Sequence, residues 1–354
     1  MDFNDKSQMR TILRLSLTNF RRVDTCPSCG GRSRDLLPLG YMPEVYPMGK
    51  LVVRLDRTVV SQRRLAHCRS CGLIYHVLIP KRSVLRNLAD DLDKERHWGS
   101  RSAKEIFASL LATHCKPLKV LDVGCGRGEF LQSLPKNWVK LGVDPNRASV
   151  NLAKRAVPEG KFFEGFFEDL DLSGLQVDVV TLWDVVEHLD DIDGVFSSLV
   201  NLLKPGGVIM IQTGDTSSVQ ARLLGSSWNY YTVLDHFIFF NEVSIHNVLS
   251  KHGLAVECIE KTTHHYYVKP LGNRILRIFK NVVFILGTGG GRFPTLWQSL
   301  SEYLDKSISW GQLPGFRDHL FVIATRQTFQ KQSSGIFMSL KRLHRLKRKW
   351  FATS

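Results

Sequence analysis

The sequence contains no run of about 18 consecutive apolar residues, the length that a membrane-spanning helix needs. Its first five residues, Met-Asp-Phe-Asn-Asp, carry two acids and show no signal-peptide pattern. These two absences argue against a membrane-spanning or secreted protein. They predict a cytoplasmic location. The charge distribution described below suggests, in addition, peripheral contact with the inner face of the cell membrane.

Cysteine is scarce, with seven residues in 354, which excludes a dense disulfide framework. Four of the seven form two Cys-x-x-Cys pairs, Cys26 with Cys29 and Cys68 with Cys71, and a glycine follows each pair. Four thiolates complete a tetrahedral shell and leave no open position, so the spacing predicts a structural Zn²⁺. The alternative is four unrelated buried cysteines.

Acidic residues are outnumbered, 33 Asp and Glu against 48 Lys and Arg, which gives a net charge of +15. The excess is uneven, because residues 326–354 hold eight Lys or Arg and no acid. A strongly basic chain is attracted to anionic partners such as nucleic acid, membrane surfaces or phosphorylated substrates. We attribute this property first to the C-terminal tail.

From residue 119 onwards, short apolar strands alternate with helices. Strands are predicted over 119–122, 140–144, 161–163, 177–182, 208–212, 255–259 and 319–324, and helices over 84–115, 129–134, 147–156, 192–203 and 242–252. Such alternation predicts right-handed βαβ units and a doubly wound α/β domain with a mostly parallel sheet. Residues 263–315 form an insertion with its own apolar and aromatic character.

A glycine-rich turn follows the first strand of this series. Residues 122–128 read Asp-Val-Gly-Cys-Gly-Arg-Gly, and glycines let a backbone turn tightly and approach a nucleotide. The spacing is Gly-x-Gly-x-Gly rather than the Gly-x-Gly-x-x-Gly of dinucleotide enzymes. Asp144 ends the next strand, where its carboxylate can accept both ribose hydroxyls. Residues 203–207, Leu-Lys-Pro-Gly-Gly, lead into the fifth strand.

Residues 120–126, 142–144, 184–189 and 203–207 together resemble the class I S-adenosylmethionine (SAM)-dependent methyltransferases, over roughly residues 100–328. The resemblance implies a seven-stranded sheet and SAM as the cofactor. The cofactor-binding residues that it implies are Asp122, Gly124, Gly126, Gly128, Asp144 and Asp184. The acid that the family often places near the adenine is displaced here to Glu168 and Asp169, within residues 165–169.

The arrangement of a zinc ribbon ahead of such a domain resembles bacterial sugar and glycan methyltransferases, in which the ribbon shapes the acceptor side. It implies O-methylation, or less readily C-methylation, of a saccharide or lipid-linked acceptor in cell-surface glycan biosynthesis or a related process. The expected organisation is a basic leader (1–22), a zinc-ribbon module (23–80), the SAM-binding domain (81–328) and a basic amphipathic tail (329–354).

Asp184, Glu187 and His188 follow the fourth strand at i, i+3 and i+4, which predicts one helical face. With His236 they could bind a second divalent metal ion, as in the plant small-RNA 2′-O-methyltransferases and ubiquinone O-methyltransferases that this pattern resembles. A histidine general base and simple substrate positioning are the other interpretations. The alternative functions are therefore a metal-assisted methyltransferase of a quinone or RNA 2′-hydroxyl, and an inactive interaction protein.

The tail places apolar residues opposite Lys and Arg over residues 336–350, the pattern of a basic amphipathic helix at a membrane surface. Nucleic acid binding and no partner are the alternatives.

We expect full-length protein to sediment with anionic vesicles at low salt and much less with neutral ones, because apolar burial and electrostatic attraction must act together. Raising the salt to about 1 M should release it, since the Debye length falls to about 3 Å. A chain truncated to residues 1–330 serves as the control and should stay in solution. Equal sedimentation of that control, or a preference for RNA at the same salt, would contradict membrane docking by the tail.

Overall fold

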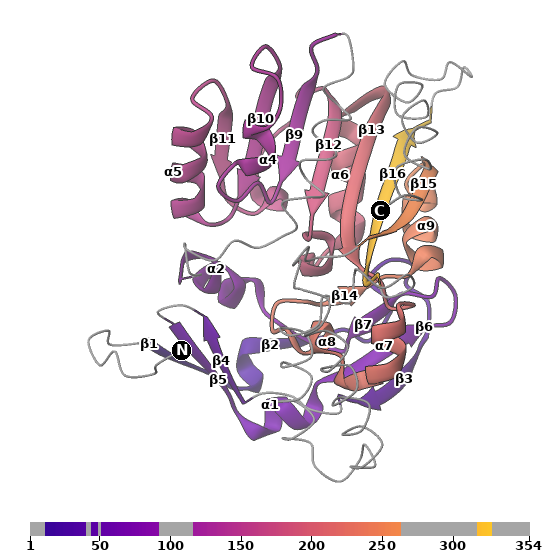
Figure 1. The fold of residues 1–354 in the computed structure, drawn as a ribbon. Helices are drawn as coiled ribbons and strands as arrows, with labels where there is room; N and C mark the ends of the chain where they lie inside the picture. The colour runs from indigo at the N-terminus through magenta and orange to yellow at the C-terminus, as the bar shows by residue number, and fades with distance from the viewer. Residues whose placement is uncertain (1–10, 40–43, 49–50, 92–115, 263–316, 328–354) are drawn as a thin grey trace, which may run out of the picture.

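The structure, a computed structural model, describes residues 11–39, 44–48, 51–91, 116–262 and 317–327 (Figure 1). The insertion predicted at 263–315, the tail predicted at 329–354 and the part of the first predicted helix beyond residue 91 lie outside these residues. In the described part of the chain, no helix is both long and apolar enough to cross a membrane.

Seven strands form the central sheet, in the order β11-β10-β9-β12-β13-β16-β15. Only β16 runs antiparallel to its neighbours, which confirms the predicted mostly parallel sheet. The strands are β9 (Lys119–Val123), β10 (Val139–Asp144), β11 (Lys161–Glu164), β12 (Val177–Trp183), β13 (Leu203–Gly214), β15 (Leu254–Thr262) and β16 (His319–Arg326).

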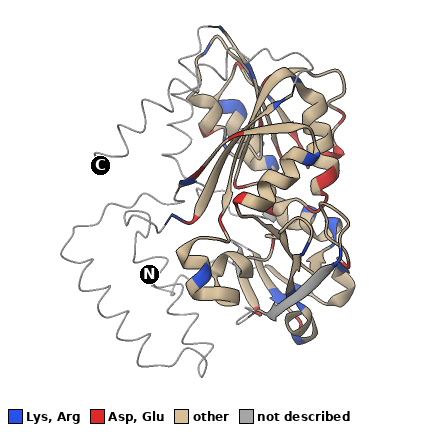
Figure 2. Ribbon diagram, turned by 90° about the vertical axis from the view of Figure 1, so that its right-hand side faces the viewer, with Lys and Arg blue, Asp and Glu red and all other residues tan. Residues whose placement is uncertain are grey.

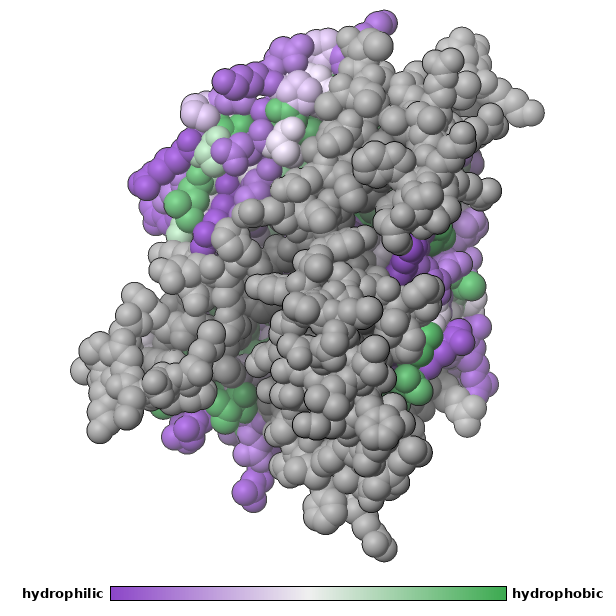
Figure 3. Space-filling model, viewed as in Figure 1, coloured by the Kyte–Doolittle hydropathy of each residue, from purple (hydrophilic) through white to green (hydrophobic). Residues whose placement is uncertain are grey.

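Apolar helices cover both faces of this sheet. One buried cluster joins α4 (Glu129–Gln132) and α5 (Arg147–Ala156) to one face, and another joins α6 (Ile192–Leu202) and α9 (Glu242–Lys251) to the other. Side chains alternate along β9, so that Val120 belongs to the first cluster and Leu121 to the second. Polar residues gather on the outer surface at the α5–β11 edge (Figure 3).

Local capping signals explain where the helices begin. The Asn146 side chain accepts a hydrogen bond from the Ser149 amide and starts α5, and Asp191 accepts one from the Gly194 amide and starts α6. At α9, Asn241 and Ser244 form a reciprocal capping box.

An N-terminal module lies below the sheet in Figure 1. Its elements are β1 (Thr11–Leu15), a 3₁₀ turn (Leu17–Asn19), β2 (Phe20–Arg22), β3 (Ser33–Pro38), β4 (Val45–Met48), β5 (Leu51–Leu55), α1 (Arg57–Gln62), β6 (Arg64–Cys68), β7 (Ile74–His76), β8 (Leu78–Pro80) and α2 (Arg82–Asp91).

The boundary predicted at residue 22 separates strands that the structure pairs. β1 aligns parallel with β5, and β2 aligns antiparallel with β8. Residues 11–22, which we expected in a basic leader, therefore belong to the N-terminal module. The apolar Leu15 and Phe20 are buried in its core, which explains why this basic stretch folds.

The segment between β13 and α9 leaves the central sheet and enters the module. It forms α7 (Val219–Leu224), α8 (Asn229–Thr232) and β14 (Ile238–Phe239), with short 3₁₀ turns between them. β14 pairs antiparallel with β7 and completes a four-stranded sheet, β14-β7-β6-β3. The module therefore closes over the carboxyl ends of β12 and β13 (Figure 1).

Ion pairs also attach the module to the central domain. Arg82 in α2 bonds to Asp190, and its guanidinium lies 3.1 Å from Glu168 and 3.3 Å from Asp169. Arg21 donates to the backbone oxygen of Asp190 at 2.8 Å. Glu168 and Asp169, the displaced acids of the sequence, are thus engaged by Arg82. Elsewhere Lys and Arg lie among Asp and Glu, as Figure 2 shows for the described residues.

Candidate active site

The glycine-rich turn connects β9 to α4. Gly124 has φ 71°, and a Cβ there would lie 2.4 Å from a methyl group of Val185, so only glycine fits. Gly126 has φ 53°, and a Cβ there would meet nothing within 4 Å, so its backbone faces open space. Gly128, also at positive φ, precedes α4. This turn therefore packs closely on one side and offers bare backbone to a ligand on the other.

Two carboxylates adjoin the turn, and one of them binds it directly. Asp144 at the end of β10 accepts the Gly126 amide at 2.8 Å on one oxygen and the Asn146 amide at 2.8 Å on the other. The carboxylate that was predicted to bind the ribose hydroxyls therefore lies directly against the glycine-rich turn. Asp122 is only 1% exposed and accepts the Thr181 hydroxyl at 2.6 Å. The structure thus buries Asp122 within β9, bonded to the neighbouring strand β12.

Asp184 occupies a sharp turn at the end of β12. With φ 55°, it is the one non-glycine residue at positive φ among the described residues, a conformation that Asp tolerates better than most side chains. Its amide donates to the Gln212 oxygen at 2.9 Å, and its carboxylate accepts from the Gln212 side chain at 3.3 Å. The chain then forms only a 3₁₀ turn, Val186–His188.

The predicted helical face is therefore wrong, because the left-handed residue interrupts the helix before it starts. Ligand atoms of Glu187, His188 and His236 nevertheless lie within 4.8 Å of one another. Asp184 does not belong to this cluster. Three of the four predicted residues are thus brought together, and the fourth lies beside them against Gln212.

Glu187 lies at the bottom of the cluster and is fully buried. One of its oxygens accepts the Tyr230 hydroxyl at 2.6 Å, and the other accepts the Thr213 hydroxyl at 3.0 Å. Burial raises the pKa of Glu187, and the negative charge of Asp184 adds to this effect. The two hydroxyls hold the carboxylate in one orientation, so it can act as a ligand or as a partner for an imidazolium.

Both histidines of the cluster donate from Nδ1 to backbone oxygens. His188 donates to the Asp235 oxygen at 2.8 Å, and His236 donates to the Tyr230 oxygen at 3.0 Å. The two rings are arranged edge to face, with their centroids 4.7 Å apart. These bonds fix the tautomer, so the Nε2 of each neutral ring is left as an acceptor for a proton or a metal ion.

The two imidazoles differ in their affinity for protons. Burial opposes the charged form of His188, but the carboxylates of Asp235 and Glu187 outweigh it and raise the pKa of His188. Burial, together with the charge of His188, lowers the pKa of His236 well below its usual value. His236 is therefore the neutral imidazole of the pair near pH 7.

The loop that carries His236 is also held from the N-terminal module. His76 in β7 donates from Nε2 to the Tyr231 oxygen at 2.8 Å, and the Tyr46 hydroxyl donates to the Thr232 oxygen at 2.9 Å. His76 adjoins the second cysteine pair in sequence, yet it supports this loop rather than the thiols. The sequence offers no local signal for either contact, because the partners are far apart along the chain.

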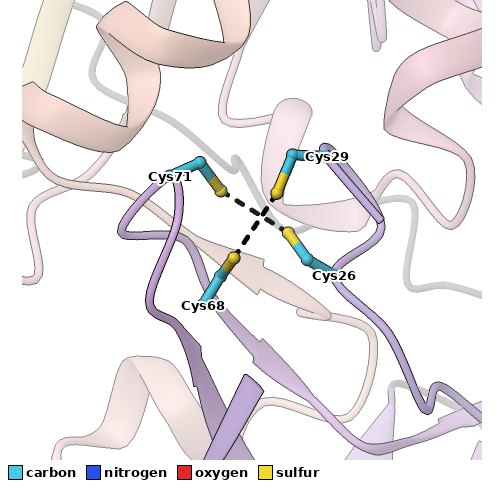
Figure 4. A group of neighbouring side chains, drawn as sticks. All are labelled: Cys26, Cys29, Cys68 and Cys71. Carbon is cyan, nitrogen blue, oxygen red and sulfur yellow. Dashed lines mark hydrogen bonds between the residues drawn. The ribbon is translucent and has the colours of Figure 1, made fainter. Parts of the chain in front are cut away.

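The four predicted cysteines converge in the N-terminal module (Figure 4). The sulfurs of Cys26 and Cys71 lie 3.5 Å apart, and those of Cys29 and Cys68 lie 3.4 Å apart. A disulfide would require about 2.05 Å. Four Zn–S bonds of about 2.3 Å at tetrahedral angles would place the sulfurs about 3.8 Å apart. The donor set and its spacing therefore fit a tetrahedral zinc ion.

Both cysteine pairs adopt the same turn. The amides of Gly30 and Gly72 donate at 2.9 Å to the oxygens of Cys26 and Cys68, and both glycines have positive φ. A hydrogen bond from Cys71 lowers the pKa of the Cys26 thiol to about 5, while the pKa of Cys71 is raised. Ionisation of one thiol therefore makes ionisation of its neighbour less favourable. A bound cation would stabilise the thiolates together.

Comparison with known proteins agrees with this geometry. Residues 95–259 match a family described as a methyltransferase domain. The order and directions of the central strands, with the glycine-rich turn at their carboxyl ends, fit the class I α/β fold, and this part of the chain is similar to that methyltransferase family.

Individual relatives are similar over part of their length. A Mycolicibacterium smegmatis protein described as an S-adenosylmethionine-dependent methyltransferase is 30% identical over 125 residues, 34% of this chain and 47% of its own. A ubiquinone biosynthesis O-methyltransferase from Mesorhizobium japonicum is 30% identical over 101 residues, 27% of this chain and 41% of its own. The chain spans about half the length of the curated relatives it matches.

Among solved structures, a methyltransferase from Mesorhizobium loti described as S-adenosylmethionine-dependent is 16% identical. The match has a TM-score of 0.41 and covers 62% of this chain and 96% of that one.

Replacing Asp144 with Ala should weaken SAM binding about 10- to 100-fold, because charge-assisted hydrogen bonds contribute about 1.5–3 kcal/mol. Isothermal titration calorimetry measures the affinity, and the melting temperature reports whether the turn stays folded. Glu164→Ala is the matched control, since this acid ends the neighbouring strand β11 and is exposed. Unchanged affinity in Asp144→Ala would remove Asp144 from the site. No SAM binding by the wild type would favour an inactive interaction protein.

Proposed function

We propose that this chain is a SAM-dependent O-methyltransferase that binds its acceptor hydroxyl at Glu187, His188 and His236. The supporting observation is that both imidazoles use Nδ1 for backbone oxygens, while ring nitrogens of both lie within 4.8 Å of one buried carboxylate. Gly124 of the glycine-rich turn packs against Val185, directly before this cluster. The proposed donor and acceptor positions are therefore neighbours.

SAM, when bound, supplies a methyl group on a good leaving group. The chain itself has to align the acceptor, exclude water and take up the hydroxyl proton. His236 suits the last task, because its lowered pKa keeps Nε2 unprotonated near pH 7. Asp235 lies 3.4 Å from Nδ1 of His188 and favours a positive charge on that ring.

For the acceptor we propose a saccharide, in cell-surface glycan or related biosynthesis, carried on a nucleotide or a polyprenyl phosphate. This rests on the N-terminal module, which closes over the acceptor end of the sheet as the resemblance to glycan methyltransferases suggests. Two of the three aromatic residues at 228–231 offer little surface to a sugar, since Trp228 and Tyr231 are only 3% and 6% exposed and pack in a core with Phe239. Tyr230 alone of the three reaches the cluster, through Glu187.

A second candidate is a metal-assisted O-methyltransferase that acts on a quinone precursor or an RNA 2′-hydroxyl. The observation that favours it is the convergence of one carboxylate and two imidazoles within 4.8 Å. Three such ligands leave coordination positions open for a hydroxyl oxygen, which a divalent ion would polarise. Relatives named as ubiquinone biosynthesis O-methyltransferases support a quinone precursor as the acceptor in this candidate function.

We also propose that Cys26, Cys29, Cys68 and Cys71 bind one structural zinc ion. α9 connects this cluster to the central domain, because Asn247 donates to the Cys71 oxygen at 3.1 Å and Lys251 donates to the Ser28 oxygen. Loss of the metal would loosen these contacts as well as the module.

His236→Ala should lower methyl transfer from labelled SAM into acceptors of a cell extract by about 10²- to 10⁴-fold, the usual effect of losing a general base. His246→Ala, an exposed histidine in α9, is the control and should retain full activity. EDTA separates the two candidates. Activity that survives EDTA favours the base, and activity that vanishes and returns with Mg²⁺ or Mn²⁺ favours the metal. Full activity in Glu187→Ala, His188→Ala and His236→Ala would show that the site is wrong.

Wild-type protein should contain one zinc ion per chain by elemental analysis, and Cys68→Ser should contain almost none and unfold at a lower temperature. Cys258→Ser, in β15, changes a cysteine outside the cluster and should keep its zinc. A wild-type stoichiometry near zero, or one that Cys68→Ser leaves unaltered, would contradict the zinc proposal.

A further inference from the structure

Arg63 is a buried cation at the end of α1. Its residue is only 1% exposed, and its amide donates to the Val59 oxygen at 3.0 Å, which fixes the backbone. None of its three guanidinium nitrogens has a hydrogen-bond partner in the part of the chain that the structure describes. Arg63 differs in this respect from Arg21 and Arg82, whose guanidinium groups make a hydrogen bond or an ion pair.

A buried guanidinium without an anionic partner strongly destabilises the folded protein. A guanidinium remains charged in proteins and carries five N–H donors, so burial cannot be relieved by losing the proton. Burial lowers the pKa of Arg63, while Tyr46 and Asp235 oppose this shift. Taking a charge out of water without a partner is among the most unfavourable changes in a protein interior. A buried arginine of this kind indicates an anion that satisfies it.

The side chains around Arg63 do not supply that anion. The Tyr46 hydroxyl donates to Thr232, and Arg63 lowers the pKa of His76, which already donates to Tyr231. His76 Nδ1 also has no hydrogen-bond partner within the described residues. Asp235 carries the carboxylate that acts on Arg63, but it lies against His188 at 3.4 Å.

Arg63 is close to the acceptor site. Tyr46 and His76 hold the oxygens of Thr232 and Tyr231, and the same loop continues to Asp235 and His236 of the cluster. Arg63 therefore lies on the module side of the loop that carries the proposed base. Tyr46, Thr232 and Asp235 keep partial exposure, so solvent reaches the residues that flank Arg63.

We propose that Arg63 binds the phosphate group of the acceptor, while the acceptor hydroxyl lies at Glu187, His188 and His236. This inference rests on the proposed function and adds the residue that would bind the phosphate or diphosphate of that acceptor. A carboxylate could engage two of the unpartnered nitrogens through one fork, whereas a phosphate or diphosphate presents enough oxygens to reach all three.

The phosphate could belong to a nucleoside diphosphate or to a polyprenyl diphosphate. Thermal melting of the full chain with pyrophosphate, UDP or farnesyl diphosphate, at ionic strength matched with NaCl, tests both. At about ten times the dissociation constant, a bound anion should raise the melting temperature by about 3 °C or more. A larger shift with UDP identifies the nucleotide as the source, and a larger shift with farnesyl diphosphate identifies the lipid. Equal shifts with all three show recognition of the diphosphate alone.

Arg63→Met should abolish these shifts, and without anion it should melt at or above the wild-type temperature, because it removes a buried guanidinium that has no hydrogen-bond partner among the described residues. Arg64→Met, the exposed neighbour, is the matched control and should respond like the wild type. Arg63→Lys keeps the charge without the fork and should respond weakly, which covers a failure of Arg63→Met to fold. The proposal would be overturned if none of the three anions raised the melting temperature of the wild type. It would also be overturned if they raised the melting temperature of Arg63→Met by the same amount.

The binding of S-adenosylhomocysteine keeps this test separate from the proposed function. Arg63→Met should bind it as the wild type does, since Arg63 lies away from the glycine-rich turn. Wild-type protein that binds the anions but neither SAM nor S-adenosylhomocysteine would contradict the methyltransferase function and leave the anion site in place.

Discussion

Backbone oxygens in the half-buried loop from Tyr230 to His236 need hydrogen-bond donors, and side chains supply them. His236 and His188 satisfy two of these oxygens from within the cluster that we propose as the acceptor site, and His76 and Tyr46 satisfy two more from the N-terminal module. Because a buried carbonyl without a donor is costly, these bonds keep the loop in a single conformation. The position of both Nε2 atoms follows from that conformation. The module is thus part of the active-site framework rather than an appendage to it.

The thiol cluster and the cofactor turn contribute to this framework from opposite sides. The second cysteine pair leads directly into β7, the strand that carries His76 and pairs with β14. The glycine-rich turn presses on Val185, which leads into Glu187 and His188. A rearrangement of the thiol cluster or of the glycine-rich turn would therefore displace the cluster of Glu187, His188 and His236, because short segments of chain connect them. We take this as the physical reason for combining the N-terminal module with the α/β domain in one chain.

Features with local causes were predictable from the sequence. The helix over residues 147–156 has an Asn cap, the strands of the central sheet are short apolar runs, and the doubled Cys-x-x-Cys spacing brings four sulfurs together. Features that depend on distant partners were not. Residues 11–22 look like a basic leader until β5 and β8 are placed beside them. The left-handed conformation of Asp184 depends on how β12 meets the turn, and no pattern of i, i+3 and i+4 spacing reveals it.

The pairing of β7 with β14 also affects how the chain reaches its native state. His76 and Tyr231 are 155 residues apart, so β7 emerges from the ribosome long before its partner strand exists. Until then, one edge of a small sheet presents unpaired amides and carbonyls to other chains. During that interval the ribosome synthesises most of the central sheet, from β9 to β13. Early occupation of the thiol cluster by a metal ion would give the module order during that interval, and so protect its open edge from aggregation.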